Sequence, residues 1–396
     1  MNEISDVHID RAVEVVRILS DEIGPRPTCS LNERAAGDLI EVELSVSGLT
    51  PRREWFSSTR SFGTTYSLIL GMALASGCLE RRSRKLASLL GLSAAALGAL
   101  EARFSPRSPM RLLRRSRSSN VFACIEPSDG ASGTVCLLSH MDSSRSGLMF
   151  HPRATPYLGS IVEAVGIAVA VNALAPLLGV RKEGRALLAG VRLLLLAAIV
   201  LLLEREVRGV DVAGANDNAS GVGACLALAA HFAEVPLANT RCVVLVTGSE
   251  ESGVFGIRDF LERHDTQGWG FINFDGVGAE ARLRVLSSEG GPISGVPADR
   301  DLLESALKVG QEYPELAAEP LAGGSGLPYD STPVLASGGQ AISIVNQDGA
   351  IPNYHWPSDV FAEFSGAAFS KAVRFAARFV ERLDPGSDAG RSGDPG

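Results

Sequence analysis

TVCLLSHMD, residues 134–142, is an apolar run that ends in a histidine and an aspartate. Its first five residues, 134–138, have the length and β-rich composition of a short buried strand. Similar runs recur along the chain at 242–246, 271–274 and 341–345, and helical patterns follow Ser220, Ser252 and Asp301. This alternation predicts an α/β fold in which a mainly parallel or mixed central sheet is flanked by helices.

Two hydrophobic insertions interrupt this pattern, at about residues 61–103 and 154–203. Each contains two apolar runs on either side of a basic turn, and the turns are Arg81–Lys85 and Arg181–Arg185. A membrane span needs about 17–25 apolar residues, so each insertion predicts a hairpin of two membrane helices. Buried or interfacial hairpins are the alternative, and for the shorter first insertion the choice stays open.

The remaining segments, 1–60, 104–153 and 204–384, are expected to form one discontinuous domain. The Gly-, Ser-, Asp- and Pro-rich tail, 385–396, is expected to be disordered.

Charge and cysteine usage exclude some classes of function. A net charge of −8 over 396 residues argues against a nucleic-acid partner. The six cysteines lie far apart without a Cys-x-x-Cys spacing, which excludes a zinc ribbon and a thioredoxin-type motif. The first twenty residues predict an amphipathic helix and lack the basic start and apolar run of a secretory signal.

Cationic residues bear on the orientation in the membrane. Nine arginines between Arg52 and Arg117 lie on the domain side of the first hairpin, against seven cationic residues in the two hairpin turns. Because cationic residues are enriched on the cytoplasmic side, this distribution favours a cytoplasmic domain attached to a multi-pass membrane region.

Several motifs carry acidic or histidine side chains where a strand ends. His140 and Asp142 share one face of the first strand, so the Asp142 carboxylate can fix the imidazole tautomer. Asp217 lies in a tight turn before a helix, where an isolated aspartate is usually a helix cap. Glu250 and Glu251 follow the 242–246 strand and point in different directions, so one can bind metal while the other handles a proton.

Two further motifs complete the set. Asp275 follows the 271–274 strand, and His355 lies among turn residues in the loop that ends at Asp359. Each motif alone is a weak signal, but together they supply two histidines, three carboxylates and one spare glutamate. A shared carboxylate with two further ligands per ion is what a hydrolytic dizinc site needs. Open α/β sheets bind ligands at this end of their strands.

The ordered motifs His-x-Asp, Asp-Asn-Ala-Ser-Gly, Glu-Glu, strand-Asp-Gly and Tyr-His-x-x-x-Asp resemble metallopeptidase family twenty-eight, the co-catalytic zinc aminopeptidases related to glutamate carboxypeptidase and glutaminyl cyclase. The segment Leu19–Pro27 also resembles that family's opening helix and turn. The likeness covers the chain outside the two insertions. The insertions themselves depart from the family and leave the route of substrate access open.

The resemblance implies a cofactor of two Zn²⁺ ions and a role for each motif. His140 and Asp275 would bind one zinc, Glu251 and His355 the other, and Asp217 would bridge both. Glu250 would be the general base that acts on a zinc-activated water. Asp142 would orient His140, and Asp359 would play a similar part near His355.

The sequence therefore predicts a membrane-embedded dizinc metallopeptidase that acts on peptides and is in contact with the lipid bilayer, with an aminopeptidase favoured. A carboxypeptidase or glutaminyl-cyclase-like activity on the same scaffold stays possible, as does a non-catalytic membrane scaffold. Retention of all five ligands disfavours the cyclase, which needs one zinc, and the presence of Glu250 disfavours the scaffold. The preferred terminal residue and the oligomeric state stay open.

Overall fold

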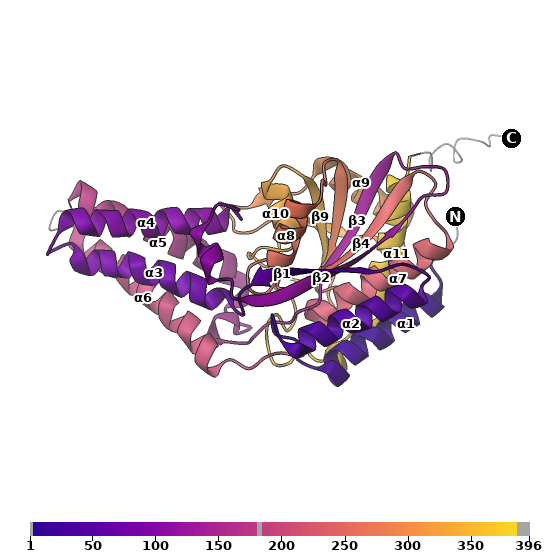
Figure 1. Ribbon diagram of the computed structural model, residues 1–396, viewed down its shortest axis with the longest axis horizontal. Helices are drawn as coiled ribbons and strands as arrows, with labels where there is room; N and C mark the ends of the chain where they lie inside the picture. Colours follow the sequence, from indigo (N-terminus) through magenta and orange to yellow (C-terminus); the bar gives the residue numbers. More distant parts are fainter. Residues whose placement is uncertain (1–2, 180–183, 386–396) are drawn as a thin grey trace.

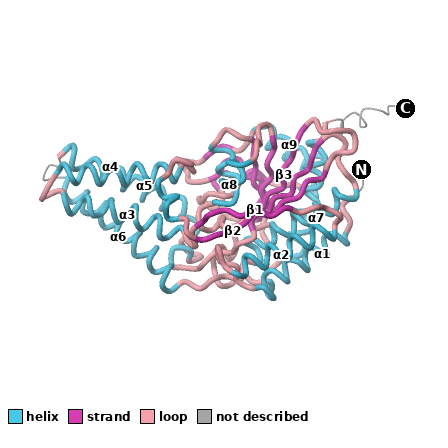
Figure 2. Tube along the Cα trace, viewed as in Figure 1, coloured by secondary structure: helices cyan, strands magenta, loops and turns pink. Residues whose placement is uncertain are grey.

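A single mixed β-sheet forms the centre of the α/β domain (Figures 1 and 2). The computed structural model describes residues 3–179 and 184–385, and within them the sheet has nine strands. These are β1 (Arg52–Ser58), β2 (Ser116–Ile125), β3 (Gly133–His140), β4 (Thr240–Thr247), β5 (Trp269–Phe274), β6 (Leu283–Glu289), β7 (Val296–Pro297), β8 (Glu319–Gly323) and β9 (Gln340–Asn346). The spatial order is β1-β2-β4-β3-β5-β9-β6-β7, and β8 pairs with β6.

The four predicted strands form the middle of this sheet. β4, β3, β5 and β9 are mutually parallel, whereas β2 is antiparallel to β4 and β6 is antiparallel to β9. The predicted α/β class with a mainly parallel or mixed sheet is confirmed. The centre of the sheet reads as continuous apolar runs because helices cover both of its faces.

Alternate side chains along the central strands pack into two separate hydrophobic cores, one on each face of the sheet. Leu137 and Val244 join the core formed with α1 (Asp6–Arg17), α2 (Leu31–Val46), α7 (Gly221–Glu234), α9 (Arg300–Glu312) and α11 (Gly366–Leu383). Leu138 and Leu245 point to the opposite face, where α8 (Phe255–Arg263) and α10 (Ser331–Ala336) pack. This is the period-two alternation of side chains along a strand, and it gives the domain three layers.

The two hydrophobic insertions form a four-helix bundle that projects from one end of the domain (Figure 1). Its helices are α3 (Phe62–Leu79), α4 (Arg84–Ala102), α5 (Leu158–Leu178) and α6 (Arg185–Arg208). Helices therefore occupy both predicted hairpin regions, and α6 continues five residues beyond the predicted end at 203. The predicted tail beyond residue 385 and most of the second basic turn lie outside the described residues.

All four bundle helices are long and apolar enough to cross a membrane. Large apolar side chains face outward on them, for example Leu89, Leu187 and Leu193, which are 65 %, 72 % and 66 % exposed. The only charged residue within the Leu-rich run of α6, Arg192, points instead into the bundle. Its guanidinium contacts Glu80 Oε2 at 2.6 Å and donates to Asn172 Oδ1 at 3.0 Å. An apolar exterior with an internally paired charge is the pattern that a lipid environment requires.

Candidate metal centre

The predicted site residues meet at the carboxyl edge of the parallel strands. β3 ends at His140, whose partner across the ladder is Thr247 at the end of β4. Glu250 and Glu251 follow β4 in a short loop, and Asp275 directly follows β5. Parallel strands present their carboxyl ends at one edge of the sheet, so side chains from distant parts of the sequence converge there.

Two irregular backbone segments bring in the remaining residues. Asp217 lies in the turn Ala215–Ser220 before α7, and its peptide bond with Asn218 is cis. Gly214 enters this turn at a φ of +65°, and a Cβ there would lie 2.5 Å from the Asp217 carbonyl oxygen, so only glycine fits. His355 lies in the loop after β9, with a φ of +50°.

Five buried side chains form two groups that share Asp217. His140, Asp217 and Asp275 make one group, and Asp217, Glu251 and His355 make the other, each with one ligand atom per residue within 4.8 Å of the others. His140 Nε2 lies 3.3 Å from Asp217 Oδ1 and 3.6 Å from Asp275 Oδ2. His355 Nε2 lies 3.1 Å from Asp217 Oδ2 and 3.3 Å from Glu251 Oε1.

The chemistry of these atoms fits a pair of divalent metal ions. Asp217 Oδ2 and Glu251 Oε1 are buried and accept no hydrogen bond from any described residue, although buried polar atoms are nearly always paired. Burial opposes a charge on His355, yet Glu251 and Asp217 raise its pKa to about 9. Burial and the charge of Asp217 raise the pKa of Asp275 to about 6. Such a concentration of carboxylates favours cations, and imidazole with carboxylate is a usual donor set for zinc.

Glu250 lies beside the two groups and belongs to neither. Its Oε2 is 4.0 Å from His140 Nε2, and its side chain is 11 % exposed. Burial raises the pKa of Glu250 well above its usual range, against the opposing effect of His140. Glu250 is thus a largely buried carboxylate beside the candidate metal positions that contributes a ligand atom to neither group.

Asp142 contacts both His140 and a second part of the site. His140 Nδ1 lies 3.0 Å from the backbone carbonyl of Asp142 and 3.6 Å from its carboxylate. The carboxylate instead accepts hydrogen bonds from the backbone N–H groups of Glu250 and Glu251, at 3.1 Å each, and from the Thr28 hydroxyl at 2.7 Å. Asp142 therefore orients His140 through its main chain and the Glu-Glu loop through its side chain.

The structure places Asp359 on the Asp217 turn and not on His355. Its two carboxylate oxygens accept hydrogen bonds from the backbone N–H groups of Asn216 and Asp217, at 2.7 and 3.0 Å. His355 Nδ1 has no hydrogen-bond partner among the described residues, and the ring is held by aromatic packing. Phe150 meets it edge-on at 4.3 Å between ring centroids, and Tyr354 stacks on it at 3.9 Å.

Arg26 was missed as a site residue by sequence reasoning. Its side chain is fully buried and donates to five backbone carbonyls, those of Leu19, Gly24, Met141, Ala213 and Gly214. It therefore ties the first turn of the chain to the segments that carry Asp142 and Asp217. The available signal was that Arg26 lies in the segment Leu19–Pro27, which resembles the family's opening helix and turn. The sequence of that segment could not show which carbonyls the Arg26 side chain contacts.

The fold is that of zinc aminopeptidases. BSAP, a zinc aminopeptidase from Bacillus subtilis, superposes with a TM-score of 0.56 at 13 % identity, covering 94 % of both chains. A Zn-dependent exopeptidase from Parabacteroides distasonis gives 0.57 at 13 %, covering 97 % of this chain and 99 % of that one. A Bacteroides thetaiotaomicron glutaminyl cyclase gives 0.55 at 14 %, covering 96 % and 98 %. None of the curated proteins compared with the sequence matches it.

Residues 203–380 match the family model of peptidase family M28. The predicted resemblance to family M28 is confirmed. The matching segment begins near the end of α6 and ends in α11, and it contains four of the five candidate ligands and Glu250. His140 and Asp142 lie before it, at the end of β3 and two residues beyond that end.

Proposed function

We propose that this protein is a membrane-embedded, two-zinc metallopeptidase that removes residues from the N-termini of peptides. The observation that carries the proposal is the sharing of Asp217 between two buried ligand groups. His140 and Asp275 would hold one ion, and Glu251 and His355 the other. The M28 family match and the zinc aminopeptidase fold support a zinc metallopeptidase, and the choice of the N-terminus is part of the proposal.

Zinc, when bound, polarises the scissile carbonyl and lowers the pKa of water towards ~7. Glu250 serves as general base, accepting a proton at its carboxylate and returning it to the departing amine. Asp142 supports this role by fixing the Glu250 and Glu251 backbone.

The bundle would anchor this centre to the bilayer. Four suitable helices and the internally paired Arg192 support a membrane location. The second insertion begins within a dozen residues of Asp142. In the sequence, the proposed membrane region therefore starts close to the metal centre. We therefore expect membrane-associated or amphipathic peptides as substrates. Equal rates on soluble dipeptide analogues and lipidated peptides in detergent would contradict that expectation.

The test is hydrolysis of a panel of free-amine and N-blocked peptides by the purified full chain. Activity on free-amine peptides alone, lost with a chelator, restored by zinc and absent in Glu250→Gln, is the expected result. Glu280→Gln is the matched control, since Glu280 is exposed and belongs to neither ligand group.

Cleavage from the C-terminus, or cyclisation of N-terminal glutamine without hydrolysis, would replace this proposal by one of the alternatives. Folded, zinc-loaded protein that leaves every peptide intact would favour a non-catalytic scaffold.

A further inference from the structure

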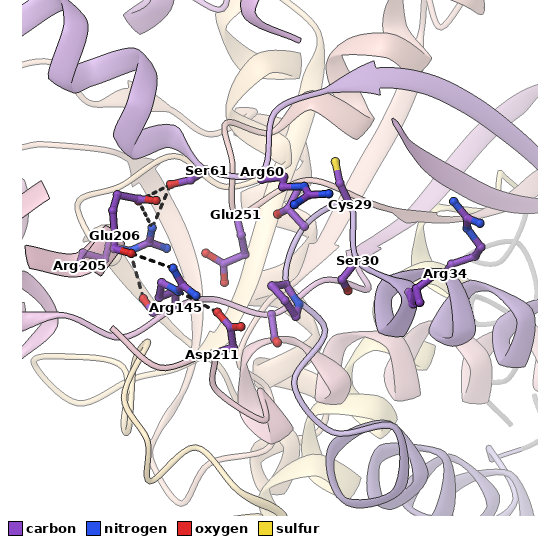
Figure 3. Close-up of a pocket in the computed structure, with 14 residues that line it drawn as sticks. Cys29, Ser30, Arg34, Arg60, Ser61, Arg145, Arg205, Glu206, Asp211 and Glu251 are labelled. Atoms are coloured by element: carbon purple, nitrogen blue, oxygen red, sulfur yellow. Dashed lines mark hydrogen bonds and ion pairs between the residues drawn. The ribbon is translucent and has the colours of Figure 1, made fainter. Parts of the chain in front are cut away.

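A cavity of about 630 Å³ lies between the metal centre and the base of the bundle. We call it the arginine cavity (Figure 3). Glu251 lines it on the side of the metal centre. Ser61, Arg205 and Glu206 line it on the side of the bundle, at the start of α3 and the end of α6. Its other lining residues include Cys29, Arg34, Arg60, Arg145 and Asp211. The cavity thus joins the candidate ligands to the part of the molecule that the insertions add.

The residues that line the arginine cavity carry a net positive charge if the candidate metal ligand Glu251 is not counted. It contains four arginines and, besides Glu251, only two acids, Glu206 and Asp211. Four positive charges against two negative charges leave an excess of two. A concave, positively charged wall favours an anionic group over an amine.

Two of these arginines are held by the protein and keep a free donor. Arg205 is 3 % exposed, and its Nε and Nη1 contact the Arg145 carbonyl, Ser61 Oγ and Glu206 Oε1 at 3.1–3.2 Å. Arg145 uses Nε for Asp211 and Nη1 for the Glu206 carbonyl. For both, Nη2 makes no hydrogen bond to any described residue, so each guanidinium is fixed in place with one donor edge unused.

Arg60 differs from both because its whole guanidinium is unengaged. It is exposed, lies directly before the start of the bundle, and forms no ion pair or hydrogen bond with the described residues. Arg34, the fourth arginine, lies over the Trp55 ring at 5.1 Å. Arg60 is therefore the side chain in this wall that is best able to take an external anion.

We propose that the arginine cavity is a substrate subsite for a carboxylate, with Arg60 as its principal ligand. The inference rests on the proposed peptidase function and specifies its substrate class: peptides that carry an acidic side chain or a free C-terminal carboxylate close to the scissile bond. Arginine binds carboxylates through paired N–H donors. A substrate group is favoured over a lipid phosphate because the cavity opens onto Glu251.

The experiment compares kcat/KM for matched peptides with the full chain. One pair differs by Glu or Gln at the second residue of an amidated tripeptide, and the other differs by a free or amidated C-terminus. The carboxylate member of at least one pair is expected to react about tenfold better, mainly through KM. Arg60→Gln is expected to reduce that ratio about tenfold. Arg52→Gln, which removes an exposed arginine outside the cavity, is expected to leave it unchanged.

The outcomes separate this inference from the proposed function. Cleavage of the neutral peptides with carboxylate ratios near one would overturn the subsite and leave the peptidase in place. Failure to cleave any peptide would overturn both. Arg60→Gln could instead leave the carboxylate ratio unchanged and abolish a stimulation of activity by vesicles of anionic lipid. That result would assign Arg60 to a lipid headgroup and refute the proposal.

Discussion

The carboxylate of Asp359 accepts a hydrogen bond from the backbone N–H of Asp217 over 3.0 Å. The two residues lie far apart in the sequence, and the contact fixes the turn that presents the carboxylate shared by both ligand groups. The position of the shared carboxylate thus depends on the loop after β9 as well as on its own turn.

Asp359→Asn should weaken metal binding. The amide keeps only one oxygen for two backbone donors, so the turn loses a hydrogen bond and a negative charge. Outer groups of this kind typically change metal affinity about 10–100-fold, and competition with a chromophoric chelator measures the change. Asp348→Asn is the control, since Asp348 pairs with Arg282 at the surface. Equal zinc affinity in the two variants would show that Asp359 does not hold the site.

Arg26→Met should destabilise the whole domain. More than one buried carbonyl would lose its donor, at about 1–3 kcal/mol each, so a loss of at least about 3 kcal/mol is expected. The thermal unfolding midpoint in detergent measures it. Arg300→Met should have almost no effect, because Arg300 is highly exposed and its ion pair is with Glu304 on its own helix. A midpoint for Arg26→Met equal to that of the wild type would contradict the assigned role.

Glu289 should make stability depend on pH. Burial raises its pKa, although the hydroxyls of Ser331, Thr332 and Ser343 donate to it at 2.7 Å. A folded-state pKa above the unfolded value of about 4.3 means that folding favours the protonated form. The contribution of Glu289 to the free energy of unfolding is therefore fully present below the unfolded-state pKa and is lost as the pH rises through the folded-state pKa. Glu289→Gln should gain stability relative to wild type as the pH rises above the unfolded value of about 4.3, as measured by unfolding midpoints. A constant difference would refute this.

The α/β domain should lie on the cytoplasmic side of the membrane. Arg103, Arg107 and Arg115 are exposed next to the bundle end of α4, as the positive-inside rule predicts for a cytoplasmic flank. A green fluorescent protein fused to the C-terminus should fluoresce, and alkaline phosphatase fused there should be inactive. The reverse pattern would place the domain outside. The chain should also resist extraction by alkaline carbonate and require detergent.

The core strands and the identity of the candidate ligands could be predicted from local sequence. β3, β4, β5 and β9 are apolar runs, and the polar residues that end them have the chemistry of metal ligands. The sequence reasoning was wrong about Asp359, which contacts the Asp217 turn, and it did not show that the Asp142 carboxylate accepts hydrogen bonds from the Glu-Glu loop. Such contacts join residues more than a hundred positions apart, and periodicity carries no information about them.

The sequence by itself determined the fold class, the apolar hairpins and the side chains available for metal binding, because periodicity and residue chemistry are local properties. Only the tertiary structure decided that Asp359 holds the Asp217 turn, that Arg26 ties three segments together, and that Arg60 lines a cavity beside Glu251. These relationships arise from the close packing of loops at one edge of the sheet, where a contact depends on three-dimensional distance and not on separation along the chain.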